Sequence, residues 1–246
     1  MRKIVTIGGG EIKDLETLKI DKEIIKLSGK KRPKVLFVPT ARSDEEGYWE
    51  VFQKVYGKKL GCKIDVLYLI GGNLTKKQIR DKILFSDVIY VGGGNTLKMM
   101  KVWRRLEVDK ILRIACNKGI VLSGLSAGSI CWFKYGHSDS MKFYNPKKWD
   151  YIRVRGLGFI NAIHCPHYNV GRRKKDFRRM MRKYPNTGIA LDENCALEFL
   201  DNKYRVIISK HGAKAYKIYK KKRKIITEII KQKQEFSPIV TLLKKQ

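Results

Sequence analysis

Short apolar runs alternate with amphipathic stretches through the first half of the chain. The runs are rich in β-branched residues and bounded by Gly or Pro, which is typical of parallel strands buried on both faces. The stretches between them carry apolar side chains at helical spacing. This alternation predicts an α/β fold, a doubly wound and mostly parallel sheet flanked by helices. The predicted strands are residues 3–7, 35–38, 64–69, 88–91 and 120–122, and the predicted helices are 18–27, 46–60, 76–84, 96–104 and 108–117.

The second half of the chain departs from this rhythm. No linker or repeat interrupts it, so we expect one domain over residues 1–246. Ligands of such a sheet bind beyond the carboxyl ends of its strands. The expected elements are an irregular loop or short hairpin at 134–161, a helix at 174–184, a strand at 187–191, an antiparallel pair at 196–200 and 204–208, and a basic, helical tail from about 213, over 215–234.

The charge balance is strongly basic. The 54 Lys and Arg residues against 23 Asp and Glu give a formal net charge of +31, which would attract nucleic acid, anionic membranes or acidic substrates. Basic clusters occur at 172–175, 178–179 and 220–224, but cations are spread through nearly every segment. No known nucleic-acid module surrounds them. We interpret the charge as solvated helix faces and expect no specific nucleic-acid partner.

Other classes are excluded by what the sequence lacks. It has no run of about 18 apolar residues and no signal-peptide core, so we expect no membrane partner and a cytoplasmic location. The five cysteines are odd in number, scattered and without a C-x-x-C pair, which predicts reduced, buried thiols. We expect no metal and no cofactor.

One pentapeptide carries a specific chemical signal. Gly124-Leu125-Ser126-Ala127-Gly128 spells G-x-S-x-G at the end of a predicted strand. Such a turn from strand to helix holds its serine in a strained conformation and exposes the hydroxyl, while the following N–H groups face any oxyanion formed there. The alternative is close packing of small residues between a strand and a helix. We interpret Ser126 as a nucleophile.

A nucleophilic serine needs a base, and the chain has four histidines. His167 follows an apolar stretch at 159–163 and would reach the same sheet edge as the serine. His164 lies within that stretch, where a histidine with satisfied hydrogen bonds in the core is expected. The spacing His164-x-x-His167 lacks a matching carboxylate for a metal site. His137 and His211 are weaker candidates.

An acid and an oxyanion hole complete the predicted site. Asp139 follows the nucleophile closely, and spacing alone does not choose between it and the competing acids Asp192, Glu193 and Glu198. Gly92-Gly93-Gly94 ends one strand and opens a helix, so N–H groups of Gly93 or Gly94 are candidates to join that of Ala127 in the oxyanion hole. Gly8-Gly9-Gly10 is interpreted as a tight turn rather than a nucleotide loop.

Three motifs together resemble a known family. Residues 91–96 (Val-Gly-Gly-Gly-Asn-Thr), 124–128 (Gly-Leu-Ser-Ala-Gly) and 166–168 (Pro-His-Tyr) occur in the order and rough spacing of the S51 serine peptidases. That group includes aspartyl dipeptidase (peptidase E) and cyanophycinase, on a flavodoxin-like, three-layer fold related to class I glutamine amidotransferases. The resemblance covers about residues 4–208.

The resemblance implies a Ser–His–acid hydrolase that cleaves a peptide bond next to an acidic residue. The nucleophile carries over to Ser126, the base to His167 and the acid to Asp139, with Glu193 as the substitute. A small peptide is the expected partner, bound near Arg172, Arg173 or Lys174, and a homodimer is left open.

Three other interpretations stay open beside this one. An α/β-hydrolase esterase shares the pentapeptide, but its histidine should lie near the C-terminus. A glutamine amidotransferase would use cysteine in place of Ser126. A binding module for nucleic acid or a protein partner would use the scaffold without catalysis.

Overall fold

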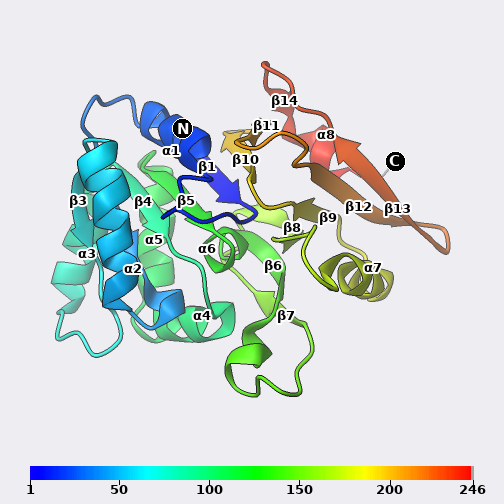
Figure 1. The fold of residues 1–246 in the computed structure, drawn as a ribbon, viewed down its shortest axis with the longest axis horizontal. Coiled ribbons are helices and arrows are strands. Elements are labelled where there is room, and N and C mark those ends of the chain that lie inside the picture. Colours follow the sequence, from blue (N-terminus) through cyan, green and yellow to red (C-terminus); the bar gives the residue numbers. More distant parts are fainter. Residues whose placement is uncertain (245–246) are drawn as a thin grey trace.

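Two mixed sheets form the framework of the protein in the computed structural model, which describes residues 1–244 (Figure 1). Residues 245 and 246, the last two of the predicted domain, lie outside the described residues. The larger sheet has the order β14-β11-β10-β1-β5-β4-β2-β3. Strands β1 to β5 run parallel to one another, whereas the pairs β1–β10, β10–β11 and β11–β14 are antiparallel. Its strands are β1 (Lys3–Ile7), β2 (Lys34–Val38), β3 (Lys63–Val66), β4 (Val88–Val91), β5 (Val121–Leu125), β10 (Cys195–Leu200), β11 (Lys203–Ile208) and β14 (Ser237–Pro238).

The second sheet has the order β13-β12-β9-β8-β6-β7. Strands β6, β8 and β9 run parallel, and β7, β12 and β13 are antiparallel to their neighbours. The predicted α/β class with flanking helices is therefore confirmed, with the strands divided between two mixed sheets. The strands are β6 (Phe133–Ser138), β7 (Ile152–Arg155), β8 (Ile160–Cys165), β9 (Gly188–Leu191), β12 (Ala215–Lys221) and β13 (Lys224–Ile230).

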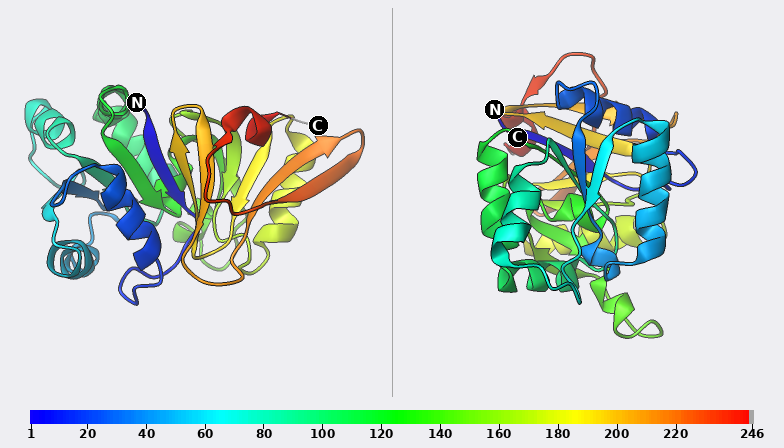
Figure 2. Two further views of the ribbon diagram at one scale, coloured as in Figure 1. Left: turned by 90° about the horizontal axis from the view of Figure 1, so that it is seen from above. Right: turned by 90° about the vertical axis from the view of Figure 1, so that its left-hand side faces the viewer.

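Helices cover both faces of the larger sheet (Figure 2, right). Alternate residues of β2 point to opposite faces, and both sets are buried. Phe37 packs with α1 and α2 on one face, whereas Leu36 packs with α3, α4 and α5 on the other. In the second sheet, α7 covers β8, β9 and β12. The helices are α1 (Leu18–Leu27), α2 (Glu46–Phe52), α3 (Lys76–Leu84), α4 (Thr96–Arg105), α5 (Val108–Asn117), α6 (Ala127–Ile130), α7 (Arg173–Lys183) and α8 (Ile239–Leu243).

The predicted helical tail is wrong. Residues 215–230 form the antiparallel hairpin β12–β13, with pairs from Ala215 opposite Ile230 to Lys221 opposite Lys224. Residues 225–230 are mostly β-branched (Ile-Ile-Thr-Glu-Ile-Ile), and such side chains favour strands. The run of basic residues over 220–224, which suggested a solvated helix face, lies at the turn instead.

Two further expectations are modified by the structure. The predicted helix 46–60 is α2 followed by a wider π-type turn over Gln53–Lys59. The predicted loop or hairpin at 134–161 contains the pair β6–β7, joined by a long connection that protrudes from the body (Figure 1).

All five cysteines are free and buried, as predicted. Within residues 1–244, no helix combines the length and apolarity needed to cross a membrane.

Candidate active site

Ser126 occupies the sharp turn between β5 and α6. Its backbone angles are φ 55° and ψ −109°, a conformation that a residue with a side chain adopts only at a cost on the order of 1–3 kcal/mol. The Ser126 N–H donates to the Ile7 carbonyl oxygen at 3.0 Å, which fixes the turn against β1. The strained strand-to-helix turn predicted from the pentapeptide is therefore present.

The two glycines of the pentapeptide are required by packing. A Cβ atom at Gly124 would lie 2.3 Å from the Gly128 carbonyl oxygen, and one at Gly128 would lie 2.1 Å from the Val91 carbonyl oxygen. Neither glycine has a positive φ. Their role is to let α6 approach β4 and β5 closely, so that the helix can begin directly after the serine.

His167 and Glu193 meet because two neighbouring parallel strands end side by side. His167 lies two residues beyond β8, and Glu193 lies two residues beyond β9. His167 Nδ1 is 3.0 Å from Glu193 Oε1, and the His167 N–H donates to the Gly8 carbonyl oxygen at 2.9 Å. The hydrogen bond from His167 lowers the pKa of Glu193 below its ordinary value. The carboxylate is therefore ionised at neutral pH and can orient the imidazole.

Gly9 makes room for this pair. A Cβ atom at Gly9 would lie 2.4 Å from His167 Nδ1 and 2.9 Å from Glu193 Cγ. The Gly9 carbonyl oxygen also accepts the Asn194 N–H at 2.9 Å, beside the acid. The segment interpreted from the sequence as a tight turn thus packs directly against the histidine and the acid.

Asp139, the predicted acid, is paired elsewhere. Its Oδ2 accepts a hydrogen bond from Arg173 Nη2 at 2.6 Å, and the Arg173 side chain is only 7% exposed. The loop after β6 carries Asp139 to the start of α7, whereas His167 lies at the ends of β8 and β9. The geometry therefore supports Glu193 rather than Asp139 as the partner of His167. An equal offset beyond adjacent parallel strands is the signal that would have favoured Glu193.

The two other competing acids are also engaged away from His167. Asp192 Oδ2 accepts hydrogen bonds from the Lys214 N–H at 3.0 Å and from Tyr216 Oη at 3.3 Å. Glu198 Oε2 accepts a hydrogen bond from Arg205 Nε at 2.6 Å.

Ser126 and His167 line one cavity of about 540 Å³. No hydrogen bond joins Ser126 Oγ to His167 within residues 1–244, and such catalytic contacts often tighten only when substrate binds. The basic residues of this cavity are Lys13 and Arg42, so the cluster at 172–174 predicted for substrate binding does not line it. The lining residues are Gly10, Glu11, Ile12, Lys13, Arg42, Glu45, Gly47, Tyr48, Val51, Gly93, Leu125, Ser126 and His167.

Two backbone donors lie beside the serine. The Ala127 N–H, first in α6, donates to no other group in the described part of the chain. Gly93 is close, since a Cβ atom there would lie 3.4 Å from Ser126 Cβ. The Gly93 N–H donates to Tyr48 Oη at 3.2 Å, and burial raises the pKa of Tyr48, which keeps the phenol protonated. Sequence reasoning missed Tyr48. Gly94 turns the chain with φ +137° and packs against the Ala41 carbonyl.

The buried histidines have structural partners. His164 Nε2 lies 2.7 Å from Ser129 Oγ, and its Nδ1 lies 3.0 Å from the Ile189 carbonyl oxygen, as expected of a core histidine. Burial lowers the pKa of His164 to about 3. His137 Nε2 lies 3.0 Å from Asp176 Oδ1. In residues 1–244 no group of three or more His, Cys, Asp or Glu side chains is placed to hold a metal ion.

Comparison with known proteins identifies relatives of this chain. The model of peptidase family S51 matches residues 4–207. The uncharacterized peptidase YgaJ of Bacillus subtilis is 34% identical over 225 residues, which cover 89% of this chain and 92% of YgaJ. The uncharacterized peptidase Lin0382 of Listeria innocua is 29% identical over 61% of this chain and 71% of its own.

Two solved structures share the fold. A peptidase from an acI-B1 Actinobacterium has a TM-score of 0.71 at 17% identity, covering 97% of both chains. A putative peptidase E from Listeria monocytogenes has a TM-score of 0.64 at 20% identity, covering 85% of this chain and 98% of its own.

Proposed function

The chain belongs to peptidase family S51, and we propose that it is a serine peptidase that cleaves small peptides at a bond next to an acidic residue. One observation carries the proposal. Ser126, in its strained turn, lines the same cavity as His167. Nδ1 of that histidine is hydrogen-bonded to Glu193. Serine hydrolases on unrelated folds use this set of nucleophile, base and orienting acid.

The first chemical step is a proton transfer coupled to attack. With Nδ1–H donated to Glu193, Nε2 of His167 is free to accept the proton of Ser126 Oγ. The serine oxygen attacks the peptide carbonyl carbon, and the leaving amine takes the proton back from His167. Water then attacks the acyl-serine ester with His167 as the base again, which releases the carboxylic acid product and regenerates Ser126.

The N–H groups of Ala127 and Gly93 form the proposed oxyanion hole. Each is fixed by a turn at the end of a parallel strand, so neither must reorganise when negative charge develops. In the free enzyme the Tyr48 hydroxyl occupies the Gly93 donor. The substrate carbonyl oxygen takes its place when the peptide enters. Gly94 then serves to hold the turn rather than to donate.

Lys13 and Arg42 support an acidic substrate. Both line the cavity that holds Ser126. Arg42 Nε lies 3.3 Å from Glu45 Oε2, an exposed pair of the kind worth about 0–1 kcal/mol, so a substrate carboxylate can displace Glu45 at little cost. Guanidinium groups bind carboxylates through two parallel hydrogen bonds, which favours Arg42 as the specificity residue.

A panel of dipeptides tests the proposal. Asp-X and Glu-X dipeptides are compared with isoaspartyl-X, Asn-X and Ala-X controls, using wild type and Ser126→Ala. We expect kcat/KM for Asp-X to exceed that for Asn-X by about tenfold or more, since a desolvated charge-assisted bond contributes about 1.5–3 kcal/mol. Equal rates for Asp-X and Ala-X would overturn the acidic preference. Full activity of Ser126→Ala would overturn the serine peptidase itself.

A further inference from the structure

Helix α7 and the tip of the β12–β13 hairpin form one strongly basic face, none of whose residues lines the Ser126 cavity. Residues 172–183 (RRKKDFRRMMRK) contain eight Lys and Arg and one acid, and residues 220–224 (KKKRK) are all basic. Helix α1, by contrast, has three lysines and two acids in LKIDKEIIKL. The basic residues of these two segments are therefore not balanced by acids, as they nearly are in α1. We call residues 172–183 and 220–224 the basic face.

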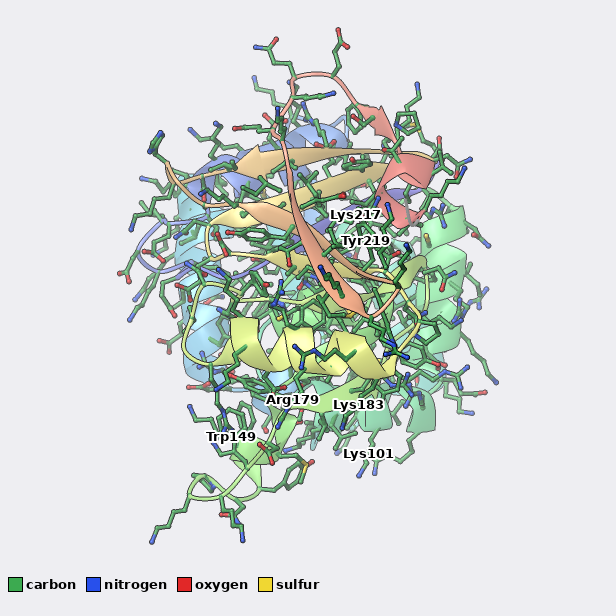
Figure 3. The ribbon with its side chains drawn as sticks, turned by 90° about the vertical axis from the view of Figure 1, so that its right-hand side faces the viewer. Lys101, Trp149, Arg179, Lys183, Lys217 and Tyr219 are labelled. Carbon is green, nitrogen blue, oxygen red and sulfur yellow. The ribbon has the colours of Figure 1, made fainter. Side chains whose placement is uncertain are left out.

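The two parts of the basic face are held together. Arg178 on α7 donates hydrogen bonds to Thr227 Oγ1 and, at 3.3 Å, to the Ile225 carbonyl oxygen, both on β13. Figure 3 shows α7 below the hairpin on one side of the molecule, with Arg179 and Lys183 labelled on the helix and Lys217 and Tyr219 on β12. A single extended ligand could therefore contact both.

Most cations of the basic face lack an acidic partner in the described part of the chain. Asp176 is the single acid of α7, and both of its oxygens are engaged, by His137 and Arg179. Arg172 and Arg173 pair with Asp150 and Asp139, which lie in the connection between β6 and β7. Within residues 1–244 the other exposed cations have no carboxylate within 4 Å, namely Lys174, Lys175, Arg182, Lys183, Lys220, Lys221, Lys222, Arg223 and Lys224.

Aromatic rings border these cations in a cavity of about 350 Å³ beside α7. Tyr151 and Tyr184 line it together with Arg153, Arg179, Lys183 and the paired acid Asp176. The Arg153 guanidinium lies over the Tyr184 ring, 3.8 Å from its centre, so this edge presents a flat cation stacked on an aromatic ring. Cations for phosphates and rings for bases are the two elements of single-strand recognition. On α7, β12 and β13 the one exposed large apolar side chain described is Ile229, which argues against a membrane.

We propose that the basic face binds single-stranded nucleic acid without sequence preference, with phosphates on the cations and bases against the Tyr151 and Tyr184 edge. This function is independent of the proposed peptidase activity. It follows from local charge and shape, and it uses none of the residues of the Ser126 cavity.

The test is fluorescence anisotropy with a labelled 20-nucleotide oligo(dT) or oligo(U) between 50 and 300 mM NaCl. The face variant is Arg182→Glu, Lys183→Glu and Lys221→Glu. Its matched control reverses the same number of exposed charges on other elements, Lys22→Glu on α1 and Lys58→Glu and Lys59→Glu in the π-type turn after α2. Figure 1 draws α1 and α2 on the side away from α7 and the hairpin. We expect the face variant to lose at least tenfold in affinity at 100 mM NaCl and the control less than threefold. The slope of log K against log [NaCl] should flatten by about 0.7 for each phosphate that the variant leaves without a cation.

Two outcomes overturn the proposal. Equal losses in the face and control variants would show that only total charge matters. Inorganic polyphosphate competing as well as the oligonucleotides, at equal phosphate concentration, would show that the bases contribute nothing. Circular dichroism of both variants confirms that each is folded, and peptidase assays at 150 mM NaCl show whether the active site is intact.

Discussion

Glu193 Oε1 lies 3.0 Å from Nδ1 of His167. This contact fixes the tautomer that leaves Nε2 free to act as the base. We therefore expect Glu193→Gln to lower kcat by about 10³-fold or more with little change in KM, because an amide favours the wrong tautomer. Stopped-time assays with an Asp-X dipeptide measure this. A loss below tenfold would remove Glu193 from the mechanism.

Asp139 should behave differently when changed. Asp139→Asn leaves the nearly buried Arg173 without its charged partner, and breaking such a pair in the interior costs about 3–5 kcal/mol. Asp139 is 29% exposed, so we expect a smaller loss, about 1–3 kcal/mol, in the free energy of unfolding measured with urea. At a temperature where the variant is folded, kcat should stay within about threefold of wild type. A catalytic loss as large as that of Glu193→Gln would restore Asp139 as the acid.

Gly9 provides a test from the other side of the histidine. A methyl group there would meet His167 Nδ1 at 2.4 Å, so the imidazole or the loop must move. We expect Gly9→Ala to lower kcat by about 10²-fold or more, since displacements of about 1 Å cost that much in catalysis. Gly29→Ala is the stability control: Gly29 has open space around it but a φ of +74°, so an alanine there strains the backbone and lowers stability without touching the site. Normal kcat in Gly9→Ala would contradict the close packing.

Tyr48 covers the Gly93 donor in the free enzyme. If the substrate carbonyl displaces its hydroxyl, Tyr48→Phe should leave kcat unchanged and raise kcat/KM by up to about fivefold, the worth of a hydrogen bond of about 1 kcal/mol. Tyr68→Phe removes an exposed tyrosine hydroxyl bonded to Glu46 and serves as the control. A fall in kcat of about 10²-fold would instead make the Tyr48 hydroxyl an oxyanion donor.

The buried Asp21 should make the free energy of unfolding depend on pH. It is buried, and burial raises its pKa from 3.8 to about 7, although it accepts hydrogen bonds from Thr17 and Tyr56. The folded protein holds this proton more tightly than the unfolded chain, so its contribution to stability is present below pH 3.8 and is lost as pH rises through 7. Asp21→Asn removes that dependence.

The difference between Asp21→Asn and wild type in free energy of unfolding should therefore grow with pH. We expect little change from pH 3.8 downward and a gain for the variant that approaches about 4 kcal/mol above pH 7, the equivalent of about three pKa units. Urea titrations at pH 4.5, 5.5, 6.5 and 7.5 measure it. A constant difference across this range would show that Asp21 does not titrate there.

The fold was predictable where local pattern and tertiary context agree. The buried strands 3–7 and 88–91 and the helices 18–27, 76–84 and 108–117 match the structure, because their apolar periodicity reflects the sheet and helix faces that they bury. The hairpin β12–β13 was not predicted, because its turn lies in a run of Lys and Arg and carries no Gly, Pro, Asn or Asp to mark the end of a strand. The division into two sheets depends on long-range strand pairing, which single-sequence periodicity does not encode.

The site residues that lie in local sequence motifs were predictable. Ser126 is marked by its flanking glycines and His167 by its place after a strand. The partner of His167 is set by which strands are neighbours in the second sheet. Spacing did not choose among the acids and the resemblance placed the acid on Asp139, whereas the geometry supports Glu193. Tyr48, Lys13 and Arg42 reach the cavity from loops and a helix start that carry no motif.

Covalent labelling of the nucleophile tests most directly whether Ser126 is the catalytic serine. Wild type, Ser126→Ala and Glu193→Gln are treated with a fluorophosphonate probe, and intact-protein and peptide mass spectrometry locate the adduct. We predict one adduct on Ser126 in wild type, none in Ser126→Ala and labelling slowed at least 10²-fold in Glu193→Gln. An unlabelled wild type, or an adduct that persists in Ser126→Ala, would contradict the assignment of Ser126 as the catalytic serine.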